Sequence, residues 1–587
     1  MFANVVVLTY QSPEIDTYSY EIPENLKGLI TTGQLVGVPF GKRNPMGIIL
    51  ETRNQKPETF KVKPINSIFF YQPILLPYQI TLLKWLSFYY HAPMVNCLEA
   101  ILPELPAKLS NYSSSGVKRN REVSSESKFS TSSNNMQKAL KQILVLVPSI
   151  NRLPKTLAQF PTAKNYTIYH NELKTSEKFA TWLKILKGNV DFVFGSRSAI
   201  FTPCPALSKI IIFDEHDVAY KDERSPYFDT LTIAEKIGQI VDAKIQIIDT
   251  APKISTYFSH KNDTQIPRAK TQTTIVPMTS EINKGNRTAV SDLLSSLIIK
   301  TVKQKGRALL FLNKKRESGQ LYCKACRFHE FLPNAPGVCP NCKSADFYFN
   351  SLNIWSLAKT IKQIVPNTQI NLIAEDSNYQ LPNSPTIQLP TIDIATASVF
   401  YRLAVYKYDL VAHILTDTTL NIADFSAPEK TFVQIINLKN LIAENGRFIL
   451  QTYNEDHPVI KAAAQGNFPT FFAQSLRERK ALLYPPFALL IKLTIKGKSQ
   501  QTIEKKAEKL AQELNQLPDT SYQTPVIVLG PYESIFSAKI PRYNIILKHK
   551  LDSYSISDRE KAIKSLSLYL EKVPRDWQIT IEPTSLN

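Results

Sequence analysis

Short apolar runs separated by polar and Gly- or Pro-containing stretches recur along the whole chain. Between residues 1 and 70, apolar and polar positions alternate, which is the pattern of short, half-buried strands. Strands are expected at 5–8, 18–22, 34–38 and 47–51. From Pro73 to Pro103, apolar residues recur at helical spacing around Trp85, which predicts a helical segment. Residues 1–105 are therefore expected to form a β-rich domain with a helical tail.

Residues 106–137 break this pattern. Ten serines lie between Ser110 and Ser133, with almost no large apolar side chains among them. Such a segment buries too little apolar surface to offset the entropy of ordering it. We interpret it as a linker.

Near-continuous apolar runs dominate the next two segments, as in parallel strands that are buried on both faces. The first segment has them at 143–147, 166–170, 192–194, 209–212 and 244–248. The second has them at 308–312, 369–373, 392–395, 410–414 and 448–452. Helical patterns lie between these runs, so two α/β lobes are predicted, one over 138–270 and one over 271–318 with 351–480. The last part, 481–587, has the order β-α-β-β-α-β, which is ferredoxin-like.

Four of the six cysteines form a C-x2-C-x12-C-x2-C pattern inside the second lobe, at Cys323, Cys326, Cys339 and Cys342. Two Cys-x-x-Cys pairs that close on each other supply the four thiolates of a tetrahedral zinc site. Four cysteines leave no open position for a catalytic water, so the zinc is expected to be structural. Two disulfides or four unrelated buried thiols are the alternatives. Residues 319–350 are thus predicted to be a zinc-binding insertion.

The chain carries 70 Lys and Arg against 50 Asp and Glu, a net charge of +20. This excess favours a polyanionic partner, most often nucleic acid, although a generally basic proteome would produce it too. The N-terminus has no basic region followed by a cleavage site, and no apolar run reaches the length of a membrane span. Cys97 and Cys204 stand alone in apolar surroundings, as buried thiols of a reducing cytoplasm do. A cytoplasmic protein is expected.

Asp214 and Glu215 follow directly after the predicted strand 209–212 and Phe213. Carboxylates at the carboxyl end of a parallel strand lie where open α/β sheets bind their ligands. An Asp that binds magnesium and a Glu that orients water would suit a nucleoside triphosphatase. Ordinary loop acids are the alternative interpretation of the same residues.

Several short motifs, in the same order along nearly the whole chain, resemble the family of primosomal protein N′, the bacterial replication-restart DNA helicases. These are VPFGK at 38–42, GSRSAIF at 195–201, FDEHDVAYK at 213–221, LNKK at 312–315, APEKTF at 427–432, QTYNEDHPVIKA at 451–462 and LLYPPF at 482–487. The resemblance implies two helicase-like (RecA-like) lobes behind an N-terminal domain that binds the 3′ end of DNA. It also implies forked or single-strand/double-strand junction DNA and other replication-restart proteins as partners, in the bacterial nucleoid.

The family's pocket for a terminal nucleotide falls on Tyr18, Ser19, Gly41 and Lys63. Tyr18 could stack on a base, Gly41 allows close approach of the backbone, and Lys63 could contact a phosphate. Ser19 replaces an Asp that would bind the terminal 3′-hydroxyl. Without the resemblance, Tyr18 would be interpreted as a core aromatic of its strand.

The chain departs from the family where nucleotide chemistry is concerned. A P-loop requires G-x-x-x-x-G-K-(S/T), but 116–123 stands in its place with a single glycine. Aligned without a gap, Phe213 occupies the position of the magnesium Asp, whereas a shift of one residue restores Asp214 and Glu215 as catalytic remnants. The segment 437–444 lacks the family's two arginines.

Because phosphoryl transfer needs the cradle, the metal and the arginines together, ATP and Mg²⁺ are not expected as cofactors. The family carries eight cysteines and two zincs, so a single Zn²⁺ is expected here. The predicted function is a fork-recognising DNA-binding protein of replication restart without ATP hydrolysis. An active ATP-dependent 3′–5′ DNA helicase is the alternative.

Overall fold

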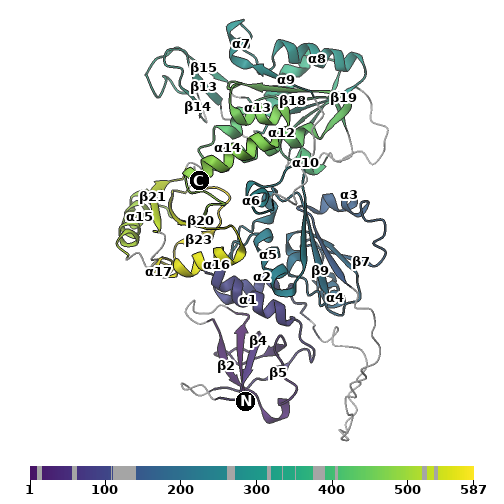
Figure 1. Ribbon diagram of the computed structural model, residues 1–587, viewed down its shortest axis with the longest axis vertical. Helices are drawn as coiled ribbons and strands as arrows, with labels where there is room; N and C mark the ends of the chain where they lie inside the picture. The colour runs from purple at the N-terminus through teal and green to yellow at the C-terminus, as the bar shows by residue number, and fades with distance from the viewer. Residues whose placement is uncertain are drawn as a thin grey trace. The chain divides into compact units, whose positions relative to one another are not determined.

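The structure is a computed structural model, shown in Figure 1. It describes residues 1–9, 16–55, 62–107, 109, 141–260, 272–313, 319–332, 335–350, 352–374, 390–402, 407–517, 525–534 and 540–587. The predicted linker therefore lies almost wholly outside the described residues. The chain forms two compact units: residues 1–249 with 487–583 and 587, and residues 250–486 with 584–586.

The first unit begins with an antiparallel sheet in which the four predicted strands are confirmed. Its order is β2 (Tyr18–Glu21), β1 (Phe2–Val7), β4 (Met46–Arg53), β3 (Leu35–Gly37) and β5 (Ser67–Ile68). The predicted helical tail consists of two helices, α1 (Pro77–Tyr89) and α2 (Met94–Ile101). The break comes just before Pro93, because a residue that precedes proline disfavours the helical conformation.

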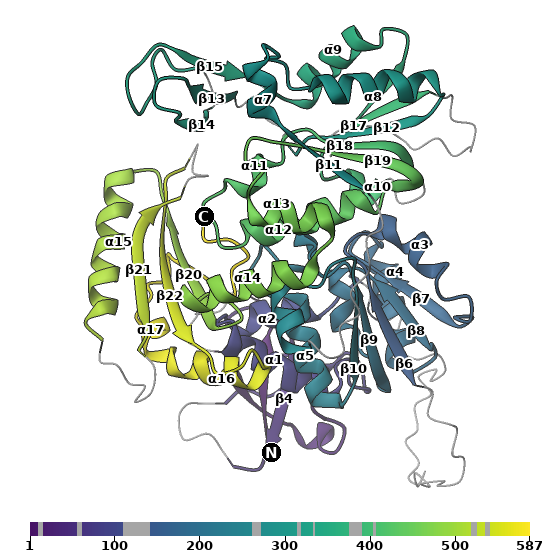
Figure 2. The same cartoon turned by 45° about the horizontal axis from the view of Figure 1, so that its top comes forward.

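A five-stranded parallel sheet follows in the same unit, as Figure 2 shows. Its order is β10 (Lys244–Ile248), β9 (Leu207–Phe213), β6 (Gln142–Leu146), β8 (Phe192–Gly195) and β7 (Tyr166–Tyr169). The helices of this part are α3 (Leu153–Leu157), α4 (Thr175–Leu186) and α5 (Thr230–Val241). Alternate residues of β6 enter different hydrophobic cores. Val145 packs in one core, and Leu144 and Leu146 pack in the other, so both faces of the sheet are covered.

The C-terminal part of the first unit has the predicted order of elements. It contains β20 (Ala488–Lys496), α15 (Gln500–Asn515), β21 (Ile527–Glu533), β22 (Arg542–Lys550), α16 (Ile556–Ser565), α17 (Ser567–Glu571) and β23 (Gln578–Ile581). The strands form an antiparallel sheet in the order β21-β22-β20-β23. The second helix of that order is divided in two, because Leu566 separates α16 from α17. One continuous hydrophobic core joins residues such as Trp85, Trp182 and Trp577, which explains why these parts form one unit.

The second unit is built on a six-stranded parallel sheet. Its order is β11 (Thr273–Pro277), β19 (Ile442–Thr452), β18 (Tyr408–His413), β12 (Arg307–Phe311), β17 (Thr391–Ala395) and β16 (Gln369–Ile373). Leu309 and Phe311 of β12 enter the core with α12 (Ala427–Lys439), α13 (Pro458–Gln465) and α14 (Phe468–Ala481). Ala308 and Leu310 enter the core with α8 (Asp292–Lys303) and α9 (Ile354–Ile364). The short helices of this unit are α6 (Ile254–Ser259), α7 (Met278–Asn283), α10 (Val399–Arg402) and α11 (Asp417–Leu420).

A small antiparallel sheet interrupts the second unit between β12 and α9. Its order is β14 (His329–Leu332), β13 (Gly319–Cys323) and β15 (Phe347–Asn350), and it lies beside α7 in Figures 1 and 2. These strands were not predicted, because each is short and the cysteine pattern dominates the segment.

None of the helices in the described ranges is both long enough and apolar enough to cross a bilayer.

Candidate nucleic-acid interface, metal centre and nucleotide-site remnants

Tyr18 lies at the start of β2, half-buried, with its ring edge-on to Phe40 at 5.0 Å between centroids. Burial raises the pKa of Tyr18, so its hydroxyl stays neutral. Phe40 and Arg43 pair through two main-chain hydrogen bonds of 2.8 and 3.0 Å, which close a tight turn around Gly41. Gly41 has φ 59° and nothing within 4 Å of the place a Cβ would take. An aromatic pair thus lies beside an exposed, open turn.

Ser19 does not share this surface, because successive side chains of a strand point to opposite faces. Its hydroxyl donates to Asn4 Oδ1 at 2.8 Å, and Asn4 Nδ2 donates to Glu51 at 2.8 Å. Arg53 donates to the same Asn4 oxygen. The structure therefore engages the Ser19 side chain in a polar network away from the Tyr18 ring.

Lys63 is exposed, and its carbonyl accepts a hydrogen bond from Glu21 N–H at 2.9 Å. Its main chain therefore runs alongside β2, two residues from Ser19, while its side chain reaches solvent. Of the four predicted pocket positions, Tyr18 and Gly41 come together through Phe40, which sequence reasoning did not single out.

The four cysteines of the insertion converge. Their sulfur atoms all lie within 4.8 Å of one another, with Cys323 Sγ 3.5 Å from Cys342 Sγ and Cys326 Sγ 3.8 Å from Cys339 Sγ. Sulfurs held about 2.3 Å from a zinc at tetrahedral angles lie about 3.8 Å apart. All six cysteines of the chain are free, so the disulfide alternative does not apply. The four thiols are placed to hold a metal ion.

The neighbourhood of the sulfurs suits thiolates. Cys323 and Cys339 are buried in a small core with Leu321, and Asn341 Nδ2 donates to Cys326 Sγ at 3.5 Å. A donor of this kind favours the charged form of the sulfur, which is the form that binds metal.

Asp214 comes directly after β9 in a left-handed conformation, φ 53°. Arg152 NH2 lies 3.0 Å from its Oδ2. Burial, together with the nearby Asp249 and Asp217, raises the pKa of Asp214 to about 6, against the lowering effect of Arg152. Phe213, the last residue of β9, is buried in a core with Phe194. The carboxylate at the strand end is therefore already matched with a guanidinium.

Glu215, His216 and Asp249 meet at the carboxyl ends of β9 and β10, with potential ligand atoms within 4.8 Å of one another. His216 Nδ1 is 3.3 Å from Asp249 Oδ2, and Glu215 is fully buried. Such a set could hold a divalent cation. A nucleotide also needs a phosphate cradle, and the sequence has no G-x-x-x-x-G-K-(S/T) stretch before β6.

Two further sequence motifs are joined at this edge. Arg197 donates to the carbonyls of Ala219 at 3.0 Å and Lys221 at 2.7 Å. It also pairs with Asp222 at 3.0 Å. GSRSAIF and FDEHDVAYK are therefore tied together by structural contacts.

Comparison with known proteins identifies residues 6–103 as a match to the family model "3'DNA-binding domain (3'BD)" of PriA. Replication restart protein PriA of Synechocystis is 27% identical over 503 residues, 76% of this chain and 59% of that protein. PriA of Treponema pallidum is 22% identical over 94% of both chains. The chain is similar to the primosomal protein N′ family over most of its length. The motif-based assignment is thereby confirmed.

The match to the Synechocystis protein spans 59% of that relative's length. Among solved structures, RecG bound to a three-way DNA junction is similar with a TM-score of 0.31 at 11% identity, over 58% of this chain and 43% of RecG. A score of that size is too low to add to the fold assignment.

Proposed function

We propose that this protein binds forked or junction DNA during replication restart, without hydrolysing ATP. The observation that carries the proposal is the 3′ DNA-binding domain match over 6–103, together with the Tyr18–Phe40 pair beside the open turn at Gly41. An aromatic ring stacks on a base, and an open glycine turn lets a strand end approach the backbone. The net charge of +20 supplies phosphate contacts. Other restart proteins would be its partners, in the nucleoid of the bacterial cytoplasm.

The second half of the proposal rests on the carboxyl edge of the first parallel sheet. Arg152 neutralises Asp214 at 3.0 Å, and the sequence has no G-x-x-x-x-G-K-(S/T) stretch. Cradle, metal and arginines act together in phosphoryl transfer, so their combined alteration favours a scaffold over a motor.

Three finer assignments accompany this function. The four thiols would hold one structural Zn²⁺, since four sulfur ligands leave no open position. The two parallel sheets would correspond to helicase-like lobes. The C-terminal part, 481–587, would be ferredoxin-like, since its elements run β-α-β-β-α-β and its sheet is antiparallel.

The test is binding of fluorescent forked DNA to the full chain, with matched blunt duplex for comparison. Tyr18→Ala should weaken fork binding by roughly 1–3 kcal/mol, and only on substrates that offer a free end. Lys63→Ala should weaken binding on all substrates and reduce the salt slope by about one contact. Ser19→Ala serves as the control on the same strand, because its hydroxyl faces Asn4.

Three outcomes would count against the proposal or one of its parts. Equal affinity for forks and blunt duplex would reduce the protein to a non-specific DNA binder. ATP hydrolysis that rises with forked DNA and is lost in Glu215→Gln would make the active helicase the correct function. A Tyr18→Ala variant that melts earlier but binds forks normally would make Tyr18 a core residue only.

A further inference from the structure

The two Cys-x-x-Cys turns of the insertion have the same main-chain pattern. In each, the residue four positions after the first cysteine donates its N–H back to that cysteine's carbonyl: Arg327 to Cys323 and Lys343 to Cys339, both at 2.9 Å. The N–H of the first cysteine in each turn donates to the carbonyl of the residue five positions later: Cys323 to Phe328 and Cys339 to Ser344, both at 2.8 Å. Arg327 and Lys343 therefore occupy equivalent places on either side of the four sulfurs.

Both of these places require a left-handed backbone. Arg327 has φ 60° and Lys343 has φ 60°. A residue with a Cβ adopts this conformation at a cost in free energy, whereas glycine adopts it freely. The chain nevertheless has a long cationic side chain at each place. A strained conformation that is kept at two equivalent positions points to a use for the side chains.

Arg327 and Lys343, here called the knuckle cations, are both exposed. Within the described part of the chain, neither is paired with a carboxylate; Lys343 Nζ reaches only the carbonyl of Pro340, at 3.3 Å. Lys324 of the same insertion differs, because it is paired with Asp346. The insertion thus presents two cations that no described carboxylate pairs with, and a third that Asp346 neutralises.

We propose that the knuckle cations bind phosphates of a DNA backbone, giving the second unit a DNA contact separate from the N-terminal domain. The identity of the partner as DNA rests on the proposed function; the pair of cations rests on the geometry of the turns. Arginine presents a fork of donors that matches a phosphate, and lysine adds a point charge. Turns that close on a metal would fix the Cα atoms of the two knuckle cations, so less conformational freedom is lost when the cations bind DNA.

The competing explanation is local. With one zinc bound, four thiolates and the ion carry a formal charge of −2, which any nearby cation would stabilise. If the knuckle cations served only this centre, removing them would weaken metal retention and leave DNA binding unchanged. The two explanations therefore predict different measurements.

The experiment uses the full chain with the double substitution Arg327→Gly and Lys343→Gly. Glycine relaxes both left-handed positions, so the fold is not put at risk. Affinity for fluorescent forked DNA is measured by anisotropy from 50 to 500 mM salt, with metal content and melting temperature recorded for each variant. Two lost phosphate contacts should reduce the slope of log K against log salt by about 1.8, a loss of roughly 60-fold at 0.1 M salt. Metal content should be unchanged and the melting temperature equal or higher.

The matched control is Lys184→Gln with Lys187→Gln, which removes the same charge from the exposed face around α4. It should leave the salt slope nearly unchanged. A double-glycine variant with wild-type DNA affinity and slope would overturn the inference, as would one that only loses metal faster. If Lys63→Ala weakens fork binding in the same assay while the double-glycine variant does not, the inference fails and the proposed function stands. If the unaltered chain does not bind DNA, both the inference and the proposed function are wrong.

Discussion

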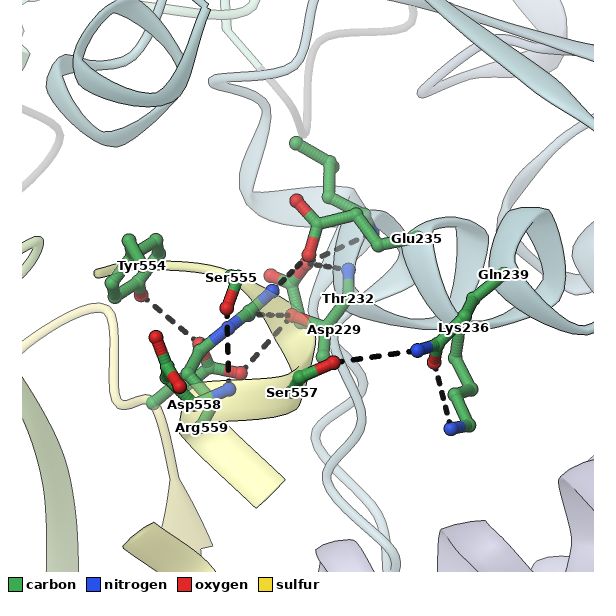
Figure 3. Close-up of polar contacts among 12 residues, drawn as sticks. Asp229, Thr232, Glu235, Lys236, Gln239, Tyr554, Ser555, Ser557, Asp558 and Arg559 are labelled. Atoms are coloured by element: carbon green, nitrogen blue, oxygen red, sulfur yellow. Dashed lines mark hydrogen bonds and ion pairs between the residues drawn. The ribbon is translucent and has the colours of Figure 1, made fainter. Parts of the chain in front are cut away.

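Replacing Arg559 by methionine should destabilise the first unit, because two carboxylates would lose their buried cation. Arg559 lies on α16 with 2% of its side chain exposed. Its NH1 is 2.7 Å from Glu582 Oε1 and 3.2 Å from Thr232 Oγ1, and it pairs with Glu235 of α5. Figure 3 shows the guanidinium reaching from α16 toward α5. Arg559 and Glu235 are 324 residues apart in the sequence, so this interaction joins two distant segments of the chain.

The size of the effect follows from Glu582. Burial by itself raises the pKa of Glu582, but Arg559 and Lys221, with hydrogen bonds from Arg559 and Tyr554, outweigh it and lower the pKa to about 2. The lowering of the Glu582 pKa from its usual 4.5 corresponds to about 3 kcal/mol of stabilisation of the folded chain, at 1.36 kcal/mol per pKa unit. Breaking a buried ion pair by removing one partner costs about 3–5 kcal/mol. Glu235 adds little, since 41% of its side chain is exposed. We expect a loss of about 3 kcal/mol.

The assay is urea unfolding followed by tryptophan fluorescence in a Trp355→Phe background. Of the four tryptophans, Trp85, Trp182 and Trp577 are in the first unit and are buried, whereas Trp355 is in the second and is 54% exposed. Fluorescence in this background therefore reports the first unit alone. Lys561→Met is the matched control on the same helix, because its pair with Asp558 is exposed and should be worth less than about 1 kcal/mol.

The pH dependence has a defined sign. The folded pKa of Glu582 is lowered, so its contribution is fully present above the unfolded value near 4.5 and is lost as the pH falls toward 2. The difference between Arg559→Met and the unaltered chain should shrink over that range. Glu582→Gln added to Arg559→Met should recover much of the loss, since no unpaired charge then remains in that place. A loss under 1 kcal/mol, or no recovery in the double variant, would refute the reasoning.

Two further predictions concern the second unit. Metal analysis should give one zinc per chain, and Cys323→Ser or a chelator should unfold the insertion locally, because metal binding energy is its folding energy; two zincs, or none, would contradict this. His413 is fully buried on β18, with no hydrogen-bond partner for either ring nitrogen within the described ranges, and burial lowers its pKa to about 3. Because the unfolded chain takes up the proton near pH 6.5, stability falls below that pH, by about 2 kcal/mol at pH 5. His413→Leu should remove this loss in urea titrations at pH 7 and 5, and an unchanged pH difference would count against it.

Much of the fold is determined locally. Apolar runs in β6, β9, β12 and β18 predict buried parallel strands, since a strand covered on both faces has no polar side to show. The C-x2-C-x12-C-x2-C spacing likewise identifies four cysteines whose sulfurs converge to within 4.8 Å, because two short turns suffice to bring them together. These patterns can be recognised in a single sequence, because each depends on residues that lie close together along the chain.

Only the tertiary structure decided which distant groups meet. Arg152 pairs with Asp214, and Ser19 donates to Asn4 on the face opposite Tyr18, although nothing in the spacing of these residues shows it. Arg559 reaches Glu235 and Glu582 for the same reason: residues 487–583 share a core with 1–249. The left-handed positions of Arg327 and Lys343 also became visible only in the folded turns. Partner choice over such separations depends on how whole sheets and helices pack, and that information lies in no single stretch of the chain.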